Sequence, residues 1–481
     1  MASPNLDAIP LEILVQITSY LSTPDYGALR LTSRFCEASL FPFFARQFFS
    51  RMQFMRTEFS LQALVDISQS RLSSYLRHVD IGVETLHSDY LQDTMAGART
   101  INRQRPANPN DNLEEKVRYN RFEEMCIDQQ VFIDLGQDQQ MLTEAFRNLQ
   151  LDTVGLQSRK LYPHDAGEGS LSCGAAKILK ETSIDLRTAR EVLTYGNDVS
   201  NASCFRSLLY ALAKSGSRPK RIETGLRKCL LPDAAFNIPR FMQQAALPIL
   251  SDLQTLSIGV GGELTENMRL IAPKGQAPYL ARTYHLRKFL GSLTQLRHLH
   301  LSYSSHFDGF FEWLAAPVPS EDYNGPPELE PPKSPALTGL RELGFTCSPI
   351  AVQHLLAIIG KCSATLQKLR LHVVSLYVDE KKAPSHHSIT YMWGDFFTTL
   401  SQIAGNLEDI HFSELNRRAR GDPRAIAFET RDNRFVQEFS YMGPDIRSEL
   451  ESLPKKISIS VDRTGKLDHM TDAPSMTAIN Q

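Results

Sequence analysis

The hexapeptide LRHLHL, residues 296–301, has leucine at its first, fourth and sixth positions. Side chains alternate between the two faces of a strand, so this spacing predicts a strand with one apolar face. The spacing recurs, with aliphatic or aromatic replacements, at Leu253-Leu256-Ile258, Leu340-Leu343-Phe345, Leu366-Leu369-Leu371 and Leu407-Ile410-Phe412, and more faintly at Leu76-Val79-Ile81 and Leu151-Val154-Leu156. Such internal repetition indicates a structure built from similar units.

The segments between these copies have the periodicity of helices. Apolar residues fall near i, i+3 and i+4 in TYHLRKFLGSLTQ (283–295), IAVQHLLAIIGKC (350–362) and MWGDFFTTLSQIAGN (392–406). Strands that alternate with helices predict an α/β fold, in which parallel strands form a sheet with helices on its outer side. Whether the faint copies between Leu76 and Leu156 belong to the same sheet stays open.

The repeat is irregular. The five strong copies are 43, 44, 26 and 41 residues apart, whereas leucine-rich repeats run about 20 to 29 residues. The asparagine or cysteine that normally follows the last leucine is also missing, because Ser304, Ser348 and Val374 occupy that position. We therefore expect an irregular arc with insertions. The stretches 102–112, 272–278 and 317–335 are predicted to be exposed loops, and the polar end from about 463 to 481 is predicted to be disordered.

Polar positions of the predicted strands would project from the concave face of this arc. Copy by copy, they are Thr255, Ser257 and Gly259; His298, His300 and Ser302; Glu342, Gly344 and Thr346; Lys368, Arg370 and His372; and Asp409, His411 and Ser413. Mixed polar groups on neighbouring strands suit a protein ligand. The candidate target-binding residues are His298, His300, Glu342, Lys368, Arg370, His372, Asp409 and His411; the alternative interpretation is an ordinary solvated face.

Several of these residues raise the question of a metal or an enzyme. Four are histidines, the commonest neutral metal ligand. The pattern places no carboxylate or thiolate to complete a coordination shell, so we expect no metal and no other cofactor. Lys368 and Arg370 would suit a phosphate. The chain lacks a phosphate-binding loop, a G-x-S-x-G elbow and an H-E-x-x-H motif, and we therefore do not expect an enzyme.

The N-terminus has much apolar surface for its length, in LDAIPLEILVQITSYLSTPDYGALRLTSRF (6–35). Pro10 suits the first position of a helix; Thr23 is the expected cap of a second helix, and a third is expected to end against Pro42. Three short helices cannot bury all these aliphatic side chains among themselves, so part of the surface should face a partner. The alternative is that the helices only cap the rest of the fold.

The residues of this segment follow the order Ile9-Pro10-x-Glu12-Ile13, Ile17, Leu21, Pro24-Asp25 and Leu29-Arg30-Leu31-Thr32-Ser33-x-Phe35. This order resembles an F-box, the segment that binds the Skp-family adaptor of cullin–RING ubiquitin ligases; Leu11 and Tyr26 depart from the family pattern. The resemblance implies the adaptor-binding residues Ile9, Pro10, Ile13, Leu14, Ile17, Leu21, Leu29 and Leu31. The later repeats and the unit at 118–156 resemble the irregular leucine-rich-repeat-like receptors common among F-box proteins of filamentous fungi.

This resemblance implies a non-catalytic substrate-recognition subunit of a Skp–cullin–F-box ubiquitin ligase. Such a subunit would bind the adaptor, cullin through the adaptor, and a target protein whose identity the sequence does not tell. The alternative is a protein-interaction scaffold, built on a leucine-rich-repeat-like arc, that directs no ubiquitin transfer. The expected domains are an F-box at 1–50, a leucine-rich-repeat-like domain at 51–435 and a C-terminal extension at 436–481.

The composition of the chain indicates which classes of partner to expect and where in the cell the protein lies. The 52 lysines and arginines nearly cancel the 54 aspartates and glutamates, so we expect neither nucleic acid nor a membrane as a partner. Seven cysteines without a CxxC pair favour reduced thiols. The N-terminus lacks a signal-peptide pattern and no apolar stretch is long enough to span a bilayer, so the expected location is cytoplasmic, nuclear or both.

Overall fold

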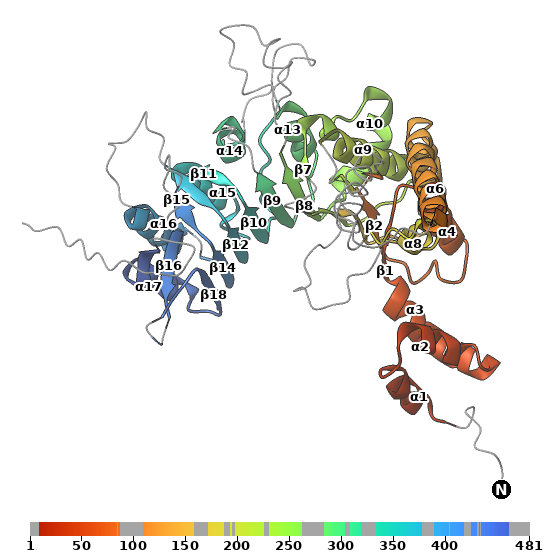
Figure 1. Ribbon diagram of the computed structural model, residues 1–481. Coiled ribbons are helices and arrows are strands. Elements are labelled where there is room, and N and C mark those ends of the chain that lie inside the picture. Colours follow the sequence, from red (N-terminus) through yellow and green to blue (C-terminus); the bar gives the residue numbers. More distant parts are fainter. Residues whose placement is uncertain are drawn as a thin grey trace, which may run out of the picture. The chain divides into compact units, whose positions relative to one another are not determined.

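A computed structural model of the chain is shown in Figure 1. It describes residues 9–83, 85–86, 109–157, 172–186, 193–194, 198–225, 230–261, 283–303, 308–318, 332–377, 389–403, 405–417, 425–430, 432 and 434–460. The chain forms two compact units, Met1–Cys229 with Ile238–Ile249, and Leu230–Asn237 with Leu250–Gln481. The predicted loop at 272–278, most of those at 102–112 and 317–335, and the predicted disordered tail lie outside the described residues.

The first unit begins with three helices, α1 (Leu11–Thr18), α2 (Thr23–Arg30) and α3 (Arg34–Phe49). Serines cap the second and third of these helices: the Asp25 N–H donates to Ser22 Oγ at 3.3 Å, and the Cys36 N–H donates to Ser33 Oγ at 3.1 Å. The expected cap Thr23 is instead the first residue of α2.

The third helix is longer than the sequence predicts, because it continues through Pro42 to Phe49. Proline has no N–H to donate to the carbonyl four residues earlier, which here belongs to Ala38. Ala38 is exposed, so water can bond to that carbonyl. Burial of Leu40 and Ala45 on either side of Pro42 stabilises the helix across it.

The first unit contains a parallel sheet in the order β1-β2-β4-β6, formed by Arg51–Phe54, His78–Gly82, Thr153–Gln157 and Arg221–Thr224. The two faint copies of the repeat therefore pair in one sheet, as β2 and β4. A small antiparallel pair joins β3 (Thr85–Leu86) and β5 (Leu193–Thr194). The helices of this unit are α4 (Glu58–Ser68), α6 (Pro109–Asp134), α7 (Gln137–Asn148), α8 (Ala175–Thr182), α9 (Asp198–Ser215) and most of α10 (Arg240–Ser251).

Helix α6 begins at Pro109, inside the stretch predicted to be a loop. Proline at a helix start loses no hydrogen bond, because the first N–H groups of a helix have no intrahelical partner. The loop prediction for 109–112 is therefore wrong.

All five strong copies of the repeat form strands in the second unit. They are β8 (Thr255–Val260), β9 (His298–Tyr303), β10 (Glu342–Thr346), β12 (Lys368–His372) and β14 (Asp409–Ser413), parallel and in this order. The apolar positions of each copy are buried. Strand β7 (Leu230–Leu231) pairs with β8, and antiparallel β18 (Glu438–Met442) pairs with β14. The predicted α/β class, with a large and mostly parallel sheet, is confirmed.

Helices connect these strands: η2 (Asp233–Phe236), α13 (Tyr284–Gly291), α14 (Asp308–Ala315), α15 (Val352–Cys362), α16 (Ile389–Ile403) and α17 (Ile446–Lys456). Among the described helices of the chain, none is both long and apolar enough to cross a bilayer. The segment expected to form a separate C-terminal extension contributes β18, α17 and β19 (Ile457–Ser460) to the second unit.

A second sheet in this unit starts immediately after three of the main strands. It contains β11 (Pro349–Ala351), β13 (Ser375–Tyr377), β15 (Asn416–Arg417), β16 (Ala425–Glu429), β17 (Phe435–Val436) and β19. Each passage from the main sheet to this one goes through a left-handed residue, Cys347, Val373 or Glu414, with φ of 50°, 53° and 49°. The N–H of each then donates across to the neighbouring segment, as Cys347 does to the His372 carbonyl at 2.9 Å.

Ser348 occupies the position at which a leucine-rich repeat normally has asparagine or cysteine. Its side chain is buried; Oγ accepts from the Tyr303 N–H at 3.1 Å and donates to the Thr346 carbonyl at 2.8 Å. A buried backbone N–H without a partner would cost about 1–3 kcal/mol. One serine hydroxyl thus bonds two backbone groups at the turn between strands.

Candidate functional site

The register of the second unit's sheet aligns the polar positions of the repeat into rows. One row runs Thr255, His298, Glu342, Lys368 and Asp409; the next runs Ser257, His300, Gly344, Arg370 and His411; the third runs Gly259, Ser302, Thr346, His372 and Ser413. The strands pair without a stagger, so equivalent positions of successive copies are direct neighbours. The sequence did not reveal this register.

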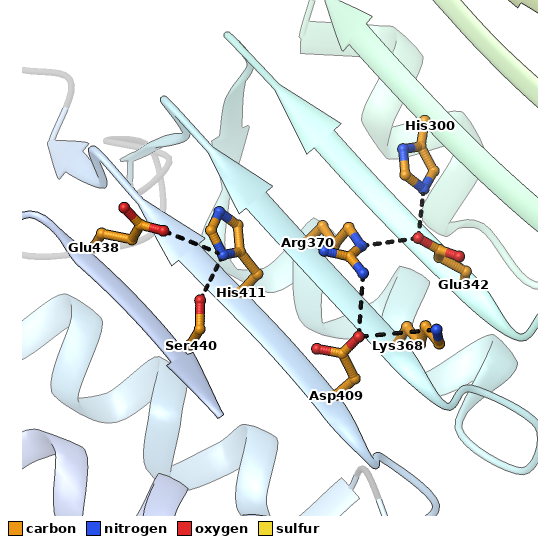
Figure 2. Close-up of polar contacts among 8 residues, drawn as sticks. All are labelled: His300, Glu342, Lys368, Arg370, Asp409, His411, Glu438 and Ser440. Atoms are coloured by element: carbon orange, nitrogen blue, oxygen red, sulfur yellow. Dashed lines mark hydrogen bonds and ion pairs between the residues drawn. The ribbon is translucent and has the colours of Figure 1, made fainter. Parts of the chain in front are cut away.

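Five residues of the first two rows form a connected network, which we call the polar cluster: His300, Glu342, Lys368, Arg370 and Asp409 (Figure 2).

Arg370 lies at the centre of the polar cluster. Its Nε donates to Glu342 Oε1 at 2.9 Å and its Nη2 donates to Asp409 Oδ2 at 3.1 Å. On the far side of Glu342, His300 Nε2 lies 3.1 Å from the same Oε1 atom. Lys368 Nζ lies 3.9 Å from Asp409 Oδ2. Two cations and two carboxylates therefore balance, and both basic residues proposed for a phosphate are paired within the chain.

Gly344 makes room for this arrangement. A Cβ atom at Gly344 would lie 3.1 Å from Cγ and Nδ1 of His300, its direct neighbour on β9. The imidazole ring thus lies across the glycine and reaches Glu342 two residues earlier on the same strand. A side chain at 344 would therefore crowd the imidazole ring, which would have to shift by a few tenths of an ångström.

The environment lowers the pKa of Glu342 from 4.5 to about 2. The hydrogen bond from His300 is the largest cause, and the hydrogen bond from Arg370 adds to it, while partial burial acts in the opposite direction. Glu342 is therefore ionised at neutral pH and holds Arg370 in place.

The other three histidines of the predicted site have different partners. His411 Nδ1 lies 2.7 Å from Ser440 Oγ and 3.8 Å from Glu438 Oε1, both on β18 (Figure 2). His372 Nδ1 lies 2.7 Å from Ser413 Oγ, and His298 Nδ1 lies 3.0 Å from Thr255 Oγ1. Within the described residues, no group of three or more His, Cys, Asp or Glu side chains is placed to hold a metal ion.

The sequence reasoning missed the contribution of β18. This strand runs antiparallel to β14 and lacks the repeat spacing, so a search for repeats passes over it. Its polar and apolar residues do alternate in EFSY (438–441), and alternation of this kind is the signal that identifies a strand with one solvated face.

The exposed part of the polar face of the second unit's main sheet is smaller than predicted. Thr255, Ser302, Asp409 and Ser413 were expected to project into solvent, but each is at most 9% exposed. Strands about 4.8 Å apart allow long neighbouring side chains to cover short ones. His298, His300, Glu342, Lys368, Arg370, His372 and His411 are partly exposed and form the accessible surface.

The N-terminal helices carry a second candidate surface. Their core consists of Leu14, Tyr26 and Leu40, packed against the partly buried Ile9, Val15, Leu21, Leu29, Phe44 and Phe48. Outside this core lies what we call the N-terminal apolar surface, which consists of the exposed residues Pro10, Ile13, Ile17, Tyr20, Leu31 and Phe35. Ile13 is 47% exposed and Leu31 is 70% exposed.

The eight predicted adaptor-binding residues therefore differ in accessibility. Pro10, Ile13, Ile17 and Leu31 are exposed, and Ile9, Leu21 and Leu29 are half-buried. Leu14 is fully buried between the helices, which corrects its expected place on the outer surface. Tyr26, at a position where an aliphatic residue is usual, packs edge-on against Phe44 at a centroid distance of 5.3 Å and closes the helical core.

Glu37 joins the second and third helices to the segment that follows α4. Arg30 Nη1 donates to both Glu37 oxygens, at 2.9 and 2.7 Å, and its guanidinium lies 4.4 Å from the centre of the Phe44 ring. Arg71 pairs with Glu37 from the other side, and its guanidinium lies 3.7 Å from the centre of the Phe41 ring. An arginine that is stacked on a ring and paired with a carboxylate loses little further freedom, so Arg30 and Arg71 stabilise one geometry of these helices.

Compared with known proteins, the chain matches no family model and no curated protein.

Proposed function

We propose that this chain is the substrate-recognition subunit of a Skp–cullin–F-box ubiquitin ligase. Its N-terminal helices would bind the Skp-family adaptor, and the polar face of the second unit's sheet would bind a target protein. The chain itself would carry out no chemistry. It would accelerate ubiquitin transfer by holding the target near the conjugating enzyme, because proximity replaces a rare encounter between two free molecules.

The observation that carries the proposal is the N-terminal apolar surface. The helical core is closed by Leu14, Tyr26 and Leu40, yet Ile13, Ile17 and Leu31 remain outside it. Aliphatic side chains exposed together on a folded segment are typical of protein-binding sites. The F-box-like order of residues in this segment supports a Skp-family adaptor as the partner.

The polar cluster supports a target that offers both hydrogen-bond donors and acceptors. Its charges balance, and Arg370 already bonds two carboxylates. A single phosphate would have to compete with Glu342 and Asp409 for this guanidinium, so we infer that recognition does not depend on a lone phosphate. Partly exposed histidines on either side extend the surface.

The test is binding of the purified full chain to a purified Skp-family adaptor, followed by addition of cullin. The Ile13→Asp/Ile17→Asp variant should bind the adaptor about a hundredfold more weakly, because it would bury two carboxylates in an apolar interface. The matched control is Ala38→Asp/Gln47→Asp, which adds the same two charges at exposed positions of α3. This control should bind normally.

The outcomes separate the two candidate functions. Recovery of adaptor together with cullin supports a ligase subunit, whereas adaptor without cullin supports a scaffold. If the adaptor does not bind the unaltered chain, or binds both variants equally, the proposal is wrong.

A further inference from the structure

An open groove runs along helices of the first unit, and none of its lining residues belongs to the N-terminal apolar surface or to the polar cluster. We call it the α4–α6–α7 groove. Its volume is about 770 Å³, and its walls come from α4, from the end of α6 with Leu135, and from α7. Its apolar lining consists of Val65, Val131, Phe132, Leu135 and Met141. Val131 is 50% exposed and Leu135 is 67% exposed, so water covers apolar side chains that a partner would shield.

The charged residues in the lining are all acidic. Glu58, Asp128 and Glu144 lie in the groove's lining, one on each helix, and no lysine or arginine does. Glu144 accepts a hydrogen bond from Gln69 at 2.8 Å, which leaves its charge uncompensated. In the described part of the chain, no ion pair involves any of these three carboxylates. The chain's net charge is only −2, so this acidity is local.

The helical walls of the groove determine which backbone conformation an occupant can adopt. They are helices, whose backbone groups bond within each helix, so an extended peptide would find no free strand edge to pair with. A helix satisfies its own backbone and can pack its side chains between those of the walls. From Glu58 to Gln69 the α4 wall is about 16 Å long at 1.5 Å per residue, which matches three turns of helix.

We propose that the α4–α6–α7 groove binds a basic amphipathic helix of a partner protein. Its apolar side chains would cover Val131 and Leu135, and its lysines or arginines would pair with Glu58, Asp128 and Glu144. The groove shares no lining residue with the N-terminal apolar surface or with the polar cluster, so it would be a further docking site.

The experiment uses the full chain and a fluorescein-labelled amphipathic peptide of about 14 residues, made of leucine and lysine, long enough for the groove at 1.5 Å per residue. Fluorescence anisotropy should show saturable binding that weakens as salt increases. A peptide with glutamate in place of lysine should not bind. The Glu58→Lys/Asp128→Lys/Glu144→Lys variant should bind the lysine peptide at least about tenfold more weakly.

Two further variants localise the binding. Glu114→Lys/Asp152→Lys/Glu451→Lys changes net charge equally at exposed positions outside the groove and should bind normally. Val131→Ser/Leu135→Ser leaves every charge in place but removes apolar contacts, so it should also bind at least about tenfold more weakly.

Three results of the binding experiment would overturn the proposal. The first is that the lysine peptide shows no saturable binding. The second is that the charge variant of the groove and its control charge variant lose the same amount of binding. The third is that Ile13→Asp/Ile17→Asp abolishes binding of the peptide. Sedimentation tests whether a second copy of this chain occupies the groove instead. A dimer of the unaltered chain that dissociates in the groove variants would show that it does, and would overturn the proposal. Adaptor binding is a separate measurement, so its failure would not affect this result.

Discussion

At the scale of single residues, position 344 needs glycine because the His300 ring lies against it, and not because of its backbone conformation. In Gly344→Ala, the new methyl group would lie 3.1 Å from the His300 ring, closer than ordinary van der Waals contact, so the ring would have to shift by a few tenths of an ångström and its contact with Glu342 would be strained. We expect a loss of about 1–3 kcal/mol in the free energy of unfolding, which is typical of overpacking, measured by urea denaturation. In the His300→Ala background the same substitution should cost much less. An equal cost in both backgrounds would contradict the role assigned to His300.

Glu342 makes stability depend on pH. Its pKa in the folded chain, about 2, lies below its ordinary value of 4.5. Its contribution to the free energy of unfolding is therefore complete above about pH 4.5 and is lost as the pH falls toward 2. We expect Glu342→Gln to be less stable than the unaltered chain at pH 7, by roughly 2–3 kcal/mol, and this difference to shrink at pH 3. Glu438→Gln, at an exposed glutamate of β18, should show no such change. A difference independent of pH would contradict this account.

At the scale of elements, the turn between β12 and β13 stores strain. Val373 has φ of 53°, a conformation that costs a branched residue about 1–2 kcal/mol. Asparagine tolerates this region, so Val373→Asn should raise the free energy of unfolding by about 0.5–1 kcal/mol after some lost burial. Glu414→Asn, at the equivalent turn, should gain less because glutamate is unbranched. Val374→Asn is the control, and it should destabilise because Val374 is fully buried. Destabilisation by Val373→Asn would show that this side chain's packing outweighs its strain.

At the scale of the whole molecule, the N-terminal apolar surface should make the free chain associate with itself. Ile13→Asp/Ile17→Asp should reduce concentration-dependent association in sedimentation experiments. Because both side chains lie outside the helical core, each substitution should change the free energy of unfolding by no more than about 0.5 kcal/mol. A loss of several kcal/mol would show instead that these residues belong to a core.

Local patterns in the sequence determined which segments are strands and helices, because each repeat carries its own apolar spacing. They also indicated the three N-terminal helices and the polar residues between the leucines. The length of α3 beyond Pro42 and the strand β18 were missed, since local rules favour a helix end before proline and the repeat spacing is absent from β18.

Only the tertiary structure decided which polar residues meet. Strand register places Arg370 between Glu342 and Asp409, and one glycine lets His300 reach Glu342. It also decided that Leu14 is core while Ile13 and Ile17 are surface, and that three helices leave an acidic groove. The physical reason is that periodicity specifies a side chain's direction on its own element, whereas its neighbours depend on how distant elements pair and pack.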